Sequence, residues 1–177
     1  MDRKVIERRL ALFDDMAPGL NDLACFFRAV GNFRKTTPPD AVDLKRALDQ
    51  QFHTTKYLMS PGWREAYEHF IDGCFQTYTR AGADAAIRAD VEHQRRERGG
   101  SWVAEWADCF VGKGEATPAT EVARRYEVLM EIFAIELGVP QEPSRAGSSR
   151  VTSPAQLQAR EETGASGRRS PAQLAQT

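Results

Sequence analysis

Paired cysteines and long apolar runs are both missing from this chain of 177 residues. Its three cysteines, Cys25, Cys74 and Cys109, lie far apart in the sequence. That spacing excludes a disulfide framework and a cysteine-rich zinc module, so we interpret the chain as a reduced, cytoplasmic protein. No apolar run approaches the roughly 20 residues that cross a bilayer, and the short run after Arg9 predicts no signal peptide. We therefore expect no membrane partner.

Motifs for common catalytic and nucleotide-binding sites are absent as well. The sequence contains no nucleophile elbow, no phosphate-binding loop and no dinucleotide fingerprint. The stretch Gly112-Lys113-Gly114 lacks the leading glycine pattern of a phosphate-binding loop, and we expect it to be an ordinary loop. Because no catalytic motif is present, the sequence does not indicate an enzyme, and we expect no cofactor.

An excess of positive charge is also lacking, because the formal net charge is −1. Residues 84–98 contain four arginines and four acids, and we interpret them as an exposed helix whose charges compensate one another. The expected pairs are Asp84 with Arg88 and Glu92 with Arg96. Since phosphate binding requires surplus positive charge, a nucleic-acid partner is not expected, and an accessory role on nucleic acid is our third hypothesis.

Helical periodicity, in contrast, extends over most of the chain. The apolar spacing predicts an all-α fold, a helical bundle of about five to seven helices over residues 1–139. The pairs Thr37-Pro38, Ser60-Pro61 and Thr117-Pro118 each place a capping hydroxyl before a proline that suits the first helical position. We expect Pro18-Gly19 to break or kink the first helix and Gly138 to end the last one.

Aromatic residues form a stripe in residues 63–78. The stripe predicts one buried helix face made of Trp63, Tyr67, Phe70, Ile71, Cys74, Phe75 and Tyr78. Residues 83–98 are predicted to form a further helix with Ile87 and Val91 pointing inward. Ser101 is predicted to cap a short helix that carries Trp102 and Trp106.

Residues 140–177 contain too few large apolar side chains to form a core. From Gln141 onward there is no aromatic residue, and the large aliphatic side chains are Val151, Leu157 and Leu174. Burial cannot offset the entropy of ordering such a chain, so we predict a disordered tail rich in Ser, Ala, Arg and Gln. The tail contains the sequence SPAQL twice, at residues 153–157 and 170–174. Two copies on a flexible segment suggest a linear motif with Leu157 and Leu174 as contact residues, or alternatively a duplicated linker.

Two sets of residues are candidate sites. Trp102 and Trp106 are candidate partner-binding residues, because tryptophan is enriched at binding hot spots, and the alternative is that both belong to the core. Glu65, His69 and Asp72 share a helix face and form an alternative metal or ligand site, with Glu68, His53 or His93 as further members. The leading hypothesis is a protein–protein interaction role as an adaptor, regulator or inhibitor, and self-association is left open.

Overall fold

The computed structural model describes residues 3–77 and 84–139. Within these ranges the chain is all-α, which confirms the predicted fold class. The described α-helices are α1 (Arg3–Arg28), α2 (Pro38–Thr55), α3 (Pro61–Cys74), α4 (Val91–Arg98) and α5 (Ala119–Glu136). Short 3-10 helices are η1 (Lys56–Leu58), η2 (Gly99–Ser101) and η3 (Ala104–Cys109), and β1 (Phe75–Gln76) pairs with β2 (Ala86–Ile87). The predicted tail of residues 140–177 lies outside the described residues, so its disorder and its boundary stay predictions.

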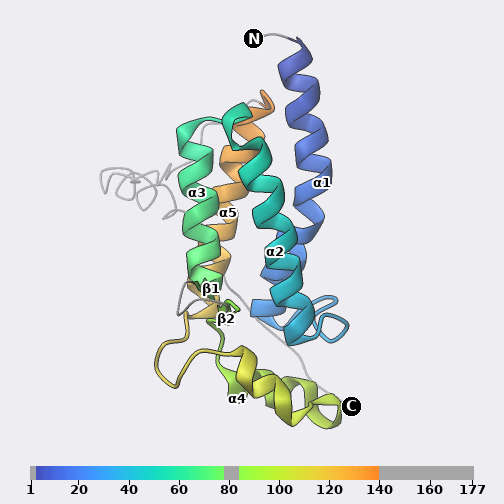
Figure 1. The fold of residues 1–177 in the computed structure, drawn as a ribbon, viewed down its shortest axis with the longest axis vertical. Helices are drawn as coiled ribbons and strands as arrows, with labels where there is room; N and C mark the ends of the chain where they lie inside the picture. The colour runs from blue at the N-terminus through green and yellow to red at the C-terminus, as the bar shows by residue number, and fades with distance from the viewer. Residues whose placement is uncertain (1–2, 78–83, 140–177) are drawn as a thin grey trace, which may run out of the picture. The chain divides into compact units, whose positions relative to one another are not determined.

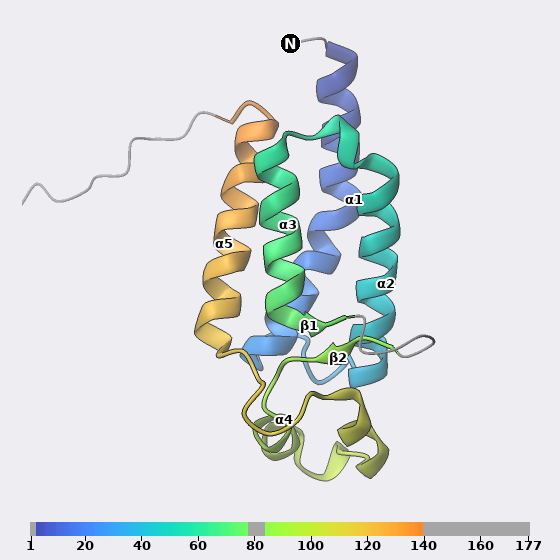
Figure 2. The same cartoon turned by 60° about the vertical axis from the view of Figure 1, so that its left-hand side comes forward.

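Four of the helices form an antiparallel bundle in which α1, α2, α3 and α5 run alternately in opposite directions (Figure 1). Helix α5 packs against α1 and α3, and α2 packs against α1. Residues 84–118, which we call the cap, connect α3 to α5 and contain β2, α4, η2 and η3. Figure 2 shows α4 beyond the end of the bundle at which α1 ends and α2 begins.

All three predicted helix starts are confirmed, and two of the three predicted caps. At α2, the Thr37 hydroxyl accepts a hydrogen bond from the Asp40 N–H, and the Asp40 carboxylate accepts one from the Thr37 N–H. At α3, the Ser60 hydroxyl accepts a hydrogen bond from the Trp63 N–H. Helix α5 starts directly after Pro118, but the cap predicted for it was wrong, because no side chain caps it. Thr117 instead donates its N–H to the Arg88 carbonyl at 2.8 Å and ties the end of the cap to its start.

Of the break or kink predicted at Pro18-Gly19, the break was wrong, since α1 continues through Pro18. The kink stays a prediction. A proline inside a helix costs about 3 kcal/mol or more. Packing offsets that cost here, because Met16 and Leu20 on either side are fully buried. Gly19 allows α2 to approach closely, since a Cβ at this position would lie 3.0 Å from Leu44 Cδ1.

The core of the bundle is aromatic, as the stripe in residues 63–75 predicted. Its buried members are Trp63, Tyr67, Phe70, Ile71, Cys74 and Phe75, whereas Tyr78 lies outside the described residues. The Phe52 and Tyr67 rings stack at 4.2 Å between centroids, and Trp63 meets Phe133 of α5 edge to face at 5.1 Å. These contacts join α2, α3 and α5 around one core.

The prediction of a helix over residues 83–98 placed its start too early. Ile87 is buried, as predicted, but it belongs to β2, where it pairs with Phe75. Helix α4 starts only at Val91, because the Asp90 carboxylate accepts a hydrogen bond from the His93 N–H and caps it. The two-residue strands were missed because they are too short to show an alternating pattern.

Candidate functional site

The cap is built around the buried side chain of Arg98, which is only 4% exposed. Its Nε donates to Gln94 Oε1 at 3.2 Å, and its Nη2 donates to the Thr36 carbonyl at 2.9 Å. Gln94 is fully buried and donates its Nε2 to the Phe26 carbonyl at 2.9 Å. These hydrogen bonds connect α4 both to the end of α1 and to the turn before α2.

Aromatic rings surround the Arg98 guanidinium. Its Cζ lies 5.3 Å from the centroid of Phe26, 5.2 Å from that of Phe33 and 5.7 Å from that of Trp106. Burial lowers the pKa of Arg98, and no carboxylate among the described residues pairs with it. The ring faces therefore take the place of a counter-charge, and a desolvated cation–π contact contributes up to about 2 kcal/mol.

The prediction that residues 84–98 form a self-compensated exposed helix was therefore wrong for Arg98. The ion pairs predicted for this segment also differ from those in the structure. Asp84 pairs with Arg46 of α2 instead of Arg88, and Glu92 lies 3.5 Å from Arg95 instead of pairing with Arg96. No sequence pattern indicates the burial of Arg98, since it stands in a run with the exposed Arg95 and Arg96.

Trp102 and Trp106 lie next to each other on the cap and are both half-buried. Their rings meet edge to face with centroids 5.7 Å apart, and Trp102 also packs against Phe110 at 6.0 Å. The Arg95 guanidinium lies 5.6 Å from the Trp102 ring centroid. Both tryptophans thus pack with one side against the cap and keep another side accessible.

The backbone that carries the tryptophans differs from the predicted capped helix. The Ser101 hydroxyl donates to the Arg98 carbonyl at 2.8 Å, so it does not cap the following segment. Trp102 follows η2, and Trp106 lies within η3, which begins at Ala104 without a side-chain cap. Val103 stands between the two helices and is 44% exposed.

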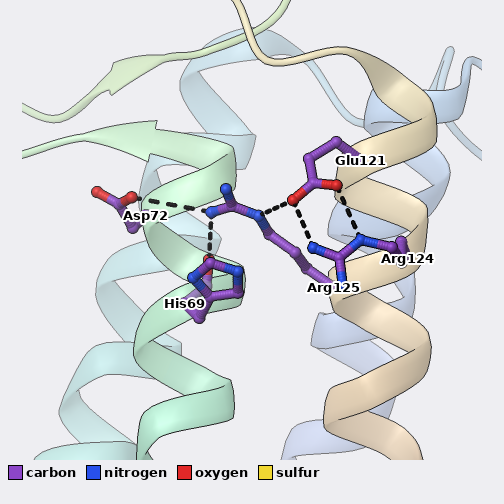
Figure 3. A network of polar contacts seen from close by, with 5 residues as sticks. All are labelled: His69, Asp72, Glu121, Arg124 and Arg125. Atoms are coloured by element: carbon purple, nitrogen blue, oxygen red, sulfur yellow. Dashed lines mark hydrogen bonds and ion pairs between the residues drawn. The ribbon is translucent and has the colours of Figure 1, made fainter.

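The alternative metal hypothesis draws on four exposed residues of α3, which are Glu65, Glu68, His69 and Asp72. Figure 3 shows two of them, His69 and Asp72, next to an ion-pair network with α5. Arg125 Nη1 donates to the backbone carbonyl of His69 at 2.8 Å and lies 3.8 Å from Asp72 Oδ2. Arg125 Nε also donates to Glu121 at 2.7 Å, and hydrogen bonds from Arg124 and Arg125 lower the pKa of Glu121 to about 2. Asp72 is therefore engaged by an arginine, and the imidazole ring of His69 takes no part in the network.

Asp72 and Glu68 also line a hollow of about 240 Å³ between α2 and α3, together with His53. Glu65 and His69 do not line this hollow, and His93 lies in the cap. Across residues 3–77 and 84–139, no group of three or more His, Cys, Asp and Glu residues is placed to hold a metal ion. The structure thus gives the metal hypothesis no support.

The same hollow contains a chain of polar contacts that the sequence did not reveal. Asp49 accepts hydrogen bonds from Lys45 Nζ at 2.6 Å and from the Tyr67 hydroxyl at 3.0 Å. Burial, followed by the nearby charge of Asp49, raises the pKa of Tyr67. Both Asp49 oxygens are thus engaged within the protein, and the chain serves to join α2 to α3.

Comparison with protein-family models, with curated proteins and with solved structures finds no match to this chain. None of the helices in the described part of the chain is long and apolar enough to cross a membrane. The remaining two predicted contact residues, Leu157 and Leu174, lie outside the described residues. Inference about function therefore rests on the geometry of the bundle and its cap.

Proposed function

We propose that this chain acts by binding a protein partner through the cap. The contact surface consists of Trp102, Val103 and Trp106, with Arg95 beside them, and is called the tryptophan surface below. In this proposal the four-helix bundle is the scaffold, and the cap is the part that recognises the partner. No reaction is assigned to the chain.

The observation that carries the proposal is the exposed Val103 beside two half-buried tryptophans in the chain, whose rings contact each other. Tryptophan and arginine are the residue types most enriched at binding hot spots, where they are packed on one side and accessible on the other. An exposed valine flanked by aromatic rings adds apolar area that a partner would cover.

Rigidity of the tryptophan surface gives further support. The Trp106 ring lies over the buried Arg98 guanidinium, and Trp102 packs against Phe110. Side chains that are already ordered lose little entropy on binding, so more of the contact energy appears as affinity. No hollow described here is lined by these tryptophans, and a protein partner fits such an ordered surface better than a small molecule, because small molecules bind in concave pockets.

The proposal is tested by Val103→Glu, with Val128→Glu on α5 as the matched control. Both valines are exposed to a similar degree, 44% and 38%, so neither glutamate should lower the melting temperature by more than a few degrees. Each tagged full-length variant is used for affinity capture from the native host, and captured proteins are quantified by mass spectrometry. We expect at least one protein to be enriched with the wild type and with V128E and lost about tenfold or more with V103E.

The captured protein is then purified, and its dissociation constant is measured for all three forms. Retention of every captured protein by V103E would contradict the proposal. Equal loss with V103E and V128E would also contradict it, because the effect would then not be specific to the cap.

A further inference from the structure

A hollow of about 590 Å³ lies on the cap, between the start of α4 and the loop of residues 111–116. Its walls are mostly small and apolar, formed by Ala89, Val91, Val111 and Ala116. Volumes of roughly 300–1,000 Å³ with apolar walls and a few polar groups are typical of small-molecule sites. No tryptophan lines this hollow, and its link to the proposed partner surface is the 3.5 Å contact of Glu92 with Arg95.

Three charged residues line the hollow, the two acids Asp90 and Glu92 and the base Lys113. Asp90 accepts a hydrogen bond from the His93 N–H at 2.9 Å, which holds the pKa of the Asp90 carboxyl below its usual value. Glu92 lies 3.5 Å from Arg95 Nη1. Lys113 forms no ion pair or hydrogen bond with any described residue. Lys113 is therefore the one cation in the lining, and no carboxylate among the described residues pairs with it.

The position of Lys113 suits a ligand that enters from solvent. Lys113 is exposed and stands between Gly112 and Gly114, and Gly114 has a positive φ of 93° that favours glycine. Val111, on the other side of Gly112, is buried and donates its N–H to the Ile87 carbonyl at 3.0 Å. The loop thus places in the lining a lysine that has no ion pair within residues 3–77 and 84–139, and a backbone hydrogen bond ties the neighbouring apolar wall to β2.

We infer that this hollow binds a small carboxylate with an apolar body of a few carbon atoms. The carboxylate pairs with the Lys113 ammonium group, and the apolar body lies against Val91 and Val111. One ammonium group matches the single charge of a carboxylate. A phosphate dianion would place a second negative charge near Asp90 and Glu92 without a second cation to balance it.

The test is a titration of the full-length, ¹⁵N-labelled protein with butyrate, hexanoate and octanoate, followed by NMR. We expect the amide signals of residues 89–92 and 111–116 to shift. Affinity should rise by about fifteenfold for two added methylene groups, because each buried methylene is worth about 0.8 kcal/mol, or about fourfold. Hexylamine, which has a similar body and the opposite charge, should bind at least about tenfold more weakly than hexanoate.

Three variants separate a site from general charge effects. Lys113→Met keeps the length of the side chain and should weaken hexanoate binding about tenfold, whereas Lys35→Met, at an exposed lysine before α2, should leave it unchanged. Glu92→Gln removes a like charge from the lining and should strengthen binding about threefold. A structural role for either lining residue would not produce changes of opposite sign.

Several results would overturn the inference. These are the absence of shifts up to about 10 mM hexanoate, an affinity that does not depend on chain length, equal binding of hexylamine, and unchanged binding by K113M. Equal weakening by K35M and K113M would overturn it as well, because it would indicate attraction to the whole surface. None of these outcomes depends on whether the tryptophan surface binds a protein.

Discussion

At the scale of single residues, Arg98 determines the conformation of the cap. Its guanidinium bonds to Gln94 and to the Thr36 carbonyl and is enclosed by three aromatic rings. A buried charge without a carboxylate partner is costly, so those rings and hydrogen bonds have to supply the compensation. The geometry is specific to arginine, because a lysine ammonium group has no planar fork with which to reach both acceptors.

We predict that Arg98→Ala lowers the free energy of unfolding by about 2–4 kcal/mol. The substitution leaves buried Gln94 Oε1 and the Thr36 carbonyl without their donor and empties the space among the rings. Arg96→Ala, at an exposed position of the same helix, should change it by less than about 0.5 kcal/mol. Urea unfolding of both variants measures the difference, and similar values for the two would contradict a structural role of Arg98.

Residue burial could be predicted from the sequence only where periodicity was strong. The stripe from Trp63 to Phe75 was correct because aromatic residues at helical spacing have one plausible arrangement. The role of Arg98 was missed because its partners come from distant positions in the chain. Phe26 and Trp106 lie on either side of it in sequence, and local patterns carry no information about their meeting.

At the scale of elements, local sequence patterns predicted where helices start but did not predict where a helix is interrupted. Thr37 and Ser60 cap their helices as expected, since the cap needs only neighbouring residues. Thr117 does not cap because its backbone is bonded to Arg88, a tertiary contact. Pro18 does not break α1 because burial on both sides of it outweighs a local preference.

The capping box of α2 gives a prediction about pH. Hydrogen bonds from the Thr37 side chain and backbone lower the pKa of Asp40 in the folded protein. Since the folded pKa is below the unfolded value of about 3.9, ionised Asp40 stabilises the protein above that pH, and this stability is lost as pH falls through the folded pKa. We expect Asp40→Asn to lower the free energy of unfolding by about 0.3–1 kcal/mol at pH 7.

The difference between wild type and D40N should decrease as pH falls below about 4. Urea unfolding at pH 7, pH 4 and pH 3 measures it, and Asp43→Asn, at an exposed carboxylate one turn further along α2, is the control. A difference that is the same at all three pH values would show that the ionised carboxylate is not what stabilises the helix start.

At the scale of the whole described molecule, the bundle and the cap differ in how they are held together. The bundle depends on aromatic packing among α1, α2, α3 and α5, and its far end is held by the ion pair of Arg9 with Glu136 at 2.6 Å. The cap adds the buried side chains of Ile87, Ala89 and Phe110 to the core, and it is held as well by one buried arginine and a few backbone contacts. The all-α class followed from the sequence, but the separate cap did not, because its elements are too short to leave a periodic signal.

The most direct test of the proposed role of the cap is photo-crosslinking in the native host. A benzophenone amino acid is placed at position 103 in one full-length protein and at position 128 in another, since both positions are exposed. If the tryptophan surface binds a partner, irradiation should yield a discrete crosslinked product from position 103 and none from position 128. The same products from both positions, or no product from position 103, would contradict the proposal.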